Sequence, residues 1–125
     1  MFTIDEENTI SITRGDVGII EIRVENTGRG NYVFQPGDII RFKVFNKKQH
    51  SSVVLNKEIT VETEADVVDL VLEPSDTTIG GTINKPVDYW YEVELNPYTI
   101  PQTIVGYDAD GAKIFRLYPE GGVVK

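Results

Sequence analysis

Residues Val87–Leu95 read Val-Asp-Tyr-Trp-Tyr-Glu-Val-Glu-Leu and carry the clearest structural signal in the chain. Every second side chain is apolar or aromatic: Val87, Tyr89, Tyr91, Val93 and Leu95. The side chains between them are acidic apart from one tryptophan: Asp88, Trp90, Glu92 and Glu94. Successive side chains of an extended chain point to opposite faces, so this period of two predicts a half-buried β-strand.

The same alternation recurs in short segments that are separated by turn signals, and no convincing long helix interrupts them. The expected strands lie within Thr9–Thr13, Gly18–Glu25, Ile39–Phe45, Val53–Val61, Asp66–Glu73, Val87–Leu95, Thr103–Tyr107 and Ala112–Tyr118. Pro74–Thr78 favours a single helical turn, because proline suits a first helical position. The sequence predicts one all-β domain over residues 1–125, an antiparallel sandwich or barrel of about seven to eight strands.

Two turn-forming stretches also match short binding motifs. Arg14-Gly15-Asp16 is the integrin-binding tripeptide, and Asp108-Ala109-Asp110-Gly111 is similar to the opening of a calcium loop. We favour a tight turn for the first, and for the second a hairpin turn between the last two strands. The residues after Gly111 supply neither a third oxygen ligand nor the distal glutamate in register.

The composition limits the classes of partner. The chain has no cysteine, a net charge of −8 and a pI near 4.6. The absence of cysteine excludes disulfides and thiolate chemistry, and the acidic balance disfavours nucleic-acid binding. No apolar run reaches the length of a membrane helix, and the acidic start is unlike a signal peptide.

Residues for catalysis are sparse. His50 is the only histidine and lies in a polar stretch beside two lysines. The neighbouring Ser51 and Ser52 do not form a Gly-x-Ser-x-Gly elbow, and Gly28-Arg29-Gly30 does not complete a dinucleotide motif. We therefore expect no enzyme activity, no catalytic residues, no cofactor and no metal site.

Trp90 is the most informative side chain outside the expected core. It shares its face with acidic residues, so its ring either lies beneath the stem of Arg41 or Lys43 or anchors an interface. Tyr32 and Phe34 in the long loop, and Tyr98 in the proline-flanked segment, are candidates to extend the same patch.

The order of these strands and turns resembles small tail-associated proteins of bacteriophages and prophages, and most closely the N-terminal domain of phage upper baseplate proteins. The stretches that carry the resemblance are Ile10–Asp16, Ile39–Val44, Val68–Leu72 with Pro74–Thr77, Tyr89–Leu95, Thr103–Gly106 and Pro119–Gly121. The resemblance implies an immunoglobulin-like β-sandwich and a non-enzymatic structural or accessory role in a tail, baseplate or head. It also implies assembly in the bacterial host cytoplasm and a final location in the virion.

This resemblance implies binding to copies of the same chain, to other phage structural proteins, or to both. The expected contact residues are Trp90, Tyr32, Phe34 and Tyr98, with further pairing at edge strands near Pro97 and Pro101. Nucleic acid and membranes are not expected partners. The alternative is a carbohydrate-binding β-sandwich module in which Trp90 and Tyr98 form a stacking platform.

Overall fold

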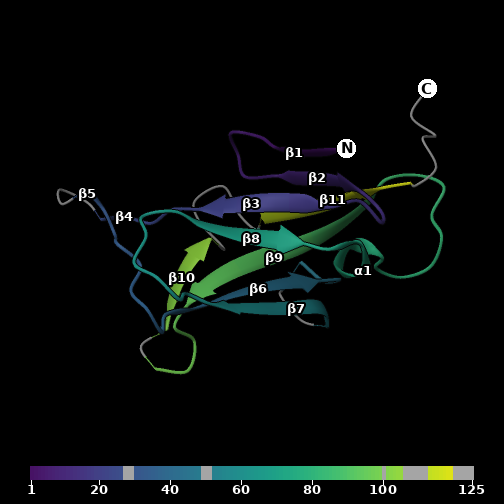
Figure 1. The fold of residues 1–125 in the computed structure, drawn as a ribbon. Coiled ribbons are helices and arrows are strands. Elements are labelled where there is room, and N and C mark those ends of the chain that lie inside the picture. Colours follow the sequence, from purple (N-terminus) through teal and green to yellow (C-terminus); the bar gives the residue numbers. More distant parts are fainter. Residues whose placement is uncertain (27–29, 49–51, 100, 106–112, 120–125) are drawn as a thin grey trace.

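A computed structural model describes residues 1–26, 30–48, 52–99, 101–105 and 113–119 (Figure 1). These residues form an all-β fold with one short helix, as the alternating pattern predicts. The elements are β1 (Phe2–Ile4), β2 (Ile10–Thr13), β3 (Gly18–Ile22), β4 (Glu25–Asn26), β5 (Gly30–Asn31), β6 (Ile39–Phe45), β7 (Val53–Thr60), β8 (Val68–Leu72), α1 (Pro74–Thr77), β9 (Val87–Leu95), β10 (Gln102–Val105) and β11 (Lys113–Tyr118).

One large sheet has the strand order β1-β2-β11-β9-β6-β7, with β10 also pairing with β9. Neighbouring strands are antiparallel except for β2 and β11, which run parallel with Phe115 opposite Ile10. The expectation of a purely antiparallel arrangement is therefore wrong for this sheet. A parallel pair needs a long crossover, and here nearly the whole chain lies between the two strands.

A second layer is formed by β3 and β8, an antiparallel pair that lies over the large sheet in Figure 1. Its inward residues alternate along each strand, as in Ile20 and Ile22 of β3. They join one buried cluster with residues of the large sheet, among them Phe42 and Phe115, which are fully buried. Burial of these apolar side chains between the two layers is the main force that holds them together.

The stretch Val87–Leu95 forms β9, a central strand of the large sheet. Tyr91, Val93 and Leu95 are buried, whereas Trp90 and the acidic side chains of the opposite row are only partly covered. One edge of β9 pairs with β6 along most of its length. The predicted alternation is thus confirmed in the second half of the strand, and Val87 and Tyr89 remain half-buried.

The other edge of β9 is shared by two strands. β11 pairs with its first half and β10 with its second half, and both run antiparallel to β9. Two strands with the same direction cannot be the arms of a hairpin, so the predicted hairpin between the last two strands is wrong. Asp108–Gly111, where the turn was predicted, lies outside the described residues.

Both short local predictions for the first turn and the helix are confirmed. The Arg14–Gly15 turn closes with a hydrogen bond from the Asp16 N–H to the Thr13 carbonyl at 2.9 Å, and Gly15 has φ of 88°. α1 begins at Pro74, and Asp76 in its first turn accepts a hydrogen bond from the backbone of Glu73 at 2.8 Å. The helix follows β8 directly, so it lies at one side of the two layers (Figure 1).

Candidate interaction surface

The outer face of the large sheet, opposite the core, is built from paired charges. Arg41 of β6 bonds Glu94 of β9 through two nitrogens, at 2.8 and 3.1 Å. Arg116 of β11 bonds Asp88 in the same way, at 2.7 and 3.2 Å. The hydrogen bond from each guanidinium raises its pKa further, so both arginines are permanently charged. Adjacent strands place these partners directly or nearly opposite one another, so the face is an ordered polar surface.

Trp90 lies on this outer face but is only half-exposed. Its cross-strand neighbours are Phe45 of β6 and Ile114 of β11. Arg41 and Lys43 face Glu94 and Glu92 instead, so the register does not place either stem opposite the tryptophan ring. Trp90 is therefore set between apolar neighbours in the sheet and is only partly covered.

Tyr98, in the turn after β9, is the most exposed of the four predicted contact residues, with 63% of its surface accessible. The Arg41 guanidinium lies 5.5 Å from the centre of its ring. Its hydroxyl donates to the Glu58 carboxylate, and this hydrogen bond raises the pKa of Tyr98. Two bonded neighbours thus fix the direction of an exposed aromatic ring.

The prediction of an exposed contact residue is wrong for Phe34, and for Tyr32 it stays a prediction. Phe34 is fully buried, and its backbone pairs with Ala65. Tyr32 is half-buried, with its ring edge-on to Phe34 at 5.4 Å and its hydroxyl donating to Asp38 at 2.7 Å. Aromatic bulk in a long loop here fills the end of the core, because both rings join the buried cluster or pack against it.

Asp38 holds this end of the molecule together. Burial opposes its ionisation, but hydrogen bonds from the Gln35 backbone and from the side chains of Tyr32 and Asn96 outweigh burial and lower its pKa. Asn96 in turn accepts a hydrogen bond from the Ile39 N–H at 2.8 Å. The carboxylate therefore has a structural role, linking the Tyr32 segment to the turn after β9.

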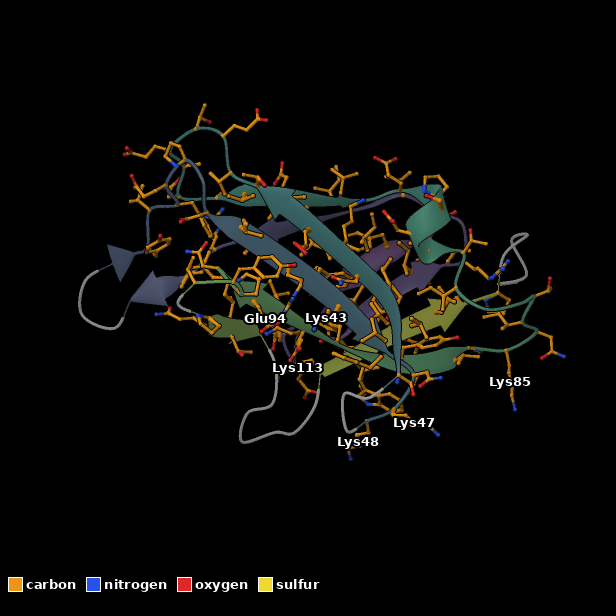
Figure 2. The ribbon with its side chains drawn as sticks, turned by 90° about the horizontal axis from the view of Figure 1, so that it is seen from below. Lys43, Lys47, Lys48, Lys85, Glu94 and Lys113 are labelled. Atoms are coloured by element: carbon orange, nitrogen blue, oxygen red, sulfur yellow. The ribbon has the colours of Figure 1, made fainter. Side chains whose placement is uncertain are left out.

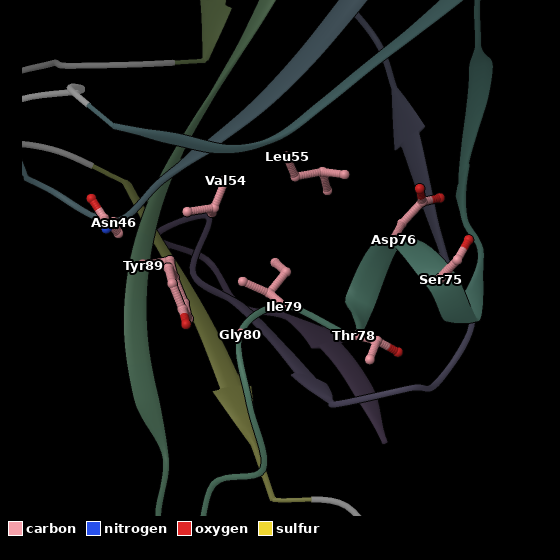
Figure 3. Close-up of a pocket in the computed structure, with 9 residues that line it drawn as sticks. All are labelled: Asn46, Val54, Leu55, Ser75, Asp76, Thr78, Ile79, Gly80 and Tyr89. Carbon is pink, nitrogen blue, oxygen red and sulfur yellow. The ribbon is translucent and has the colours of Figure 1, made fainter.

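A cleft of about 440 Å³ opens between β7 and α1 (Figure 3). Its walls are partly apolar, with Val54, Leu55, Ile79 and Tyr89, and partly polar. Asp76, the one acidic side chain in this lining, is joined to Lys57 of β7 by an ion pair. Tyr89 is the other titratable side chain in the lining.

β7 is an eight-residue strand at the end of the large sheet, and among the described strands it pairs with β6 alone. The sequence led us to expect pairing with other chains at edge strands near Pro97 and Pro101, and it did not indicate the edge of β7. The alternating pattern identified β7 as a strand but gave no information on which strands would lie at the sheet's ends. Long open edges present unpaired backbone donors and acceptors to other chains.

The lysines are spread over separate elements (Figure 2). Lys47 and Lys48 lie on the turn after β6 and Lys85 on the loop before β9, and all three are exposed. Lys43 lies on the outer face opposite Glu92, whereas Lys113 is buried at the start of β11. The positive charge is therefore distributed around the molecule.

Among the described residues, no group of three or more histidine, cysteine or acidic side chains is arranged to hold a metal ion. His50 and Ser51 lie outside the described part of the chain. In that part, too, no helix is long and apolar enough to cross a membrane. Comparisons with protein-family models, with curated proteins and with solved structures find no match to this chain.

Proposed function

We propose that this protein is a non-enzymatic structural or accessory component of a bacteriophage or prophage virion, an immunoglobulin-like β-sandwich that acts by protein–protein assembly. The observation that carries the proposal is the open eight-residue edge of β7, which lies beside the cleft and the exposed ring of Tyr98. Strand edges and exposed aromatic residues are the surfaces through which β-domains join other chains. The resemblance of the strand order to tail-associated proteins supports the same role.

The test is incorporation into particles. A tagged chain is produced in its source bacterium during phage production, and particles are purified on a density gradient and probed for the tag. We expect the chain to sediment with the particles at a fixed ratio to the major tail or head proteins. A tagged bacterial protein of similar size and charge serves as the control, and a chain that stays at the top of the gradient contradicts the proposal.

The carbohydrate-binding alternative is favoured by one observation, the fixed and exposed ring of Tyr98 beside Arg41 and Glu58. Aromatic rings flanked by polar groups can stack on sugars while the polar groups bond to hydroxyls. On this hypothesis a glycan array detects binding that Tyr98→Ala abolishes and that Tyr98→Phe retains in part. Wild-type protein that binds no glycan removes this alternative.

A further inference from the structure

We propose that two copies of this chain pair through their β7 strands, antiparallel and related by a two-fold axis at Asn56. The inference rests on the proposed function, since a single domain builds a particle only through repeated contacts, and it names the partner and the surface. β7 supplies the longest edge of the large sheet, eight residues against three in β1 at the other end.

The backbone groups that face the open edge follow from the hydrogen bonds of β6. The Asn96 N–H donates to the Ile39 carbonyl at 2.7 Å, so the backbone of Ile39 points toward β9. The Val61 N–H donates to the Asp38 carbonyl at 2.8 Å, so odd-numbered residues of this segment bond to β6. Bonding alternates along an antiparallel ladder, so the N–H and C=O groups of Asn56, Glu58 and Thr60 point to the open edge.

Charged side chains normally protect such an edge, and on β7 two of them are held by partners in the same chain. The ammonium of Lys57 is held by Asp76, and both groups are largely covered. The carboxylate of Glu58 accepts the hydroxyl of Tyr98. Because partners in the same chain hold both side chains in place, β7 is a weakly protected edge, and its two end residues, Val53 and Thr60, are uncharged.

The self-pairing register is selected by charge. In a two-fold antiparallel pair one residue faces its own copy, because opposing side chains must point to the same face. A pair centred on Lys57 or on Glu58 brings like charges together. A pair centred on Asn56 puts an uncharged amide on the axis and places Lys57 and Glu58 opposite Leu55 and Val54 of the second copy. This register uses most of β7 and opposes no like charges.

The valine end of β7 limits the length of this pairing. Val53 and Val54 are exposed by 49% and 38%, and the bulge in the β6–β7 ladder lies at this point. Val53 lies beyond this bulge, on the sheet face that carries Phe45, so the regular part of the Asn56 register runs from Val54 to Glu58. The aliphatic stem of the second copy's Lys57 lies over Leu55, at the cleft shown in Figure 3. An interface of one strand pair is small, so dimerisation depends on protein concentration.

Because the natural chain contains no cysteine, single cysteines report the register directly. Residues that exchange backbone hydrogen bonds have Cα atoms about 5.5 Å apart, within the range of a disulfide. We expect Asn56→Cys to form a disulfide dimer under mild oxidation. Thr60→Cys, exposed on the same face of the same strand, is the matched control, because its copies lie roughly 26 Å apart along the ladder. Equal cross-linking of both variants, or of neither, overturns the proposal.

Charge at position 56 gives a second test that does not depend on oxidation. Asn56→Asp and Asn56→Lys each place like charges on the axis, so each should self-associate roughly fivefold more weakly than the natural chain. An equimolar mixture restores pairing, because aspartate then faces lysine, and this restoration excludes misfolding as the cause. Sedimentation velocity over a concentration series measures the two variants, their mixture and the natural chain. Unchanged self-association in both variants, or a natural chain that is monomeric at every concentration, overturns the proposal.

The two proposals fail separately. If neither cysteine variant cross-links but the tagged chain sediments with particles, the β7 pairing is wrong and the proposed function stands. If Asn56→Cys cross-links specifically but the chain is absent from particles, the pairing stands and the virion role is wrong.

Discussion

The two sides of the sandwich differ in how the layers meet. On the side of β1 and β2, strand β3 lies so close that a Cβ on Gly18 would be 2.6 Å from the Phe2 ring. On the side of β7, the layers leave a cleft, and the ion pair between Lys57 and Asp76 connects β7 to α1 across it. Direct packing thus closes the first side at Gly18, although a cleft of about 330 Å³ lies farther along β3, and the second side depends on a polar contact. In the proposed pairing, the second side is where the second copy binds.

The largest expected loss of stability comes from a substitution at Gly18, where β3 packs closely against β1. Gly18→Ala places a methyl group against Phe2 and within 3.0 Å of Ile12, so the Phe2 ring must move out of its site. We expect a loss of about 1–3 kcal/mol in the free energy of unfolding, the usual cost of overpacking. Urea denaturation measures it.

The control for this variant is Gly81→Ala, at an exposed position where an added Cβ meets nothing within 4 Å. A second control is the pair Gly18→Ala with Phe2→Ala, which should cost less than the sum of the single changes because the clash is removed. Additive costs would mean that Phe2 and Gly18 do not compete for space.

On the open side, Asp76→Ala removes two contacts at once. The carboxylate accepts the Glu73 N–H at the start of α1 and holds the Lys57 ammonium. We expect a loss of about 1–2 kcal/mol in the free energy of unfolding, typical for a helix cap together with a partly covered ion pair. Asp76→Asn keeps an oxygen acceptor for the cap and should lose less. Equal losses in thermal or urea denaturation would show that the cap contributes nothing beyond the ion pair.

The sequence predicted the local elements of this structure better than it predicted the pairing of distant strands. Alternation identified the strands and the inward row Tyr91, Val93 and Leu95, because periodicity depends only on local geometry. It did not reveal that β2 and β11 are parallel, since pairing of distant strands is decided by the packing of the whole chain. For the same reason Phe34 was mistaken for a surface residue: a loop position says nothing of the core end that its ring fills.

The candidate surface was foreseen only in part. Tyr98 was predicted as an exposed contact residue, and its exposure is confirmed. The edge of β7 and the pair of Lys57 with Asp76 were not foreseen, because the partners lie 19 positions apart and on different elements. The periodicity of a sequence reveals neither which strand ends a sheet nor which charged residues pair between two layers.

A third prediction concerns the hydroxyl of Tyr91, which contacts the turn between β1 and β2. The Tyr91 hydroxyl donates to the Asn8 carbonyl in the β1–β2 turn at 2.5 Å. Tyr91→Phe should lower the free energy of unfolding by about 1 kcal/mol at neutral pH, the usual net value of one hydrogen bond. The loss arises because the Asn8 carbonyl then has to find another donor.

Tyr91 also predicts a pH dependence. Burial, and secondarily the charge of Asp5, raises the pKa of Tyr91 above the ordinary tyrosine value. The unfolded chain therefore releases the phenolic proton first, so the stability from this group is complete below about pH 10 and is lost as the pH rises above it. Tyr91→Phe should flatten the decline in stability above pH 10. An unchanged alkaline slope in the variant would contradict the assignment.

The smallest effect on stability is expected at Tyr98. This variant tests whether contacts on the β7 side serve the fold or self-association. Tyr98→Phe keeps the ring beside Arg41 and removes only the hydroxyl that bonds Glu58. The residue is exposed, so the denaturation midpoint should stay unchanged. The charged Glu58 carboxylate is then no longer held by Tyr98, so it can turn across the edge of β7 and should weaken self-association. Sedimentation of the variant beside the natural chain separates the two quantities: a shifted midpoint with unchanged association would mean that Tyr98 supports the fold and leaves the open side unaffected.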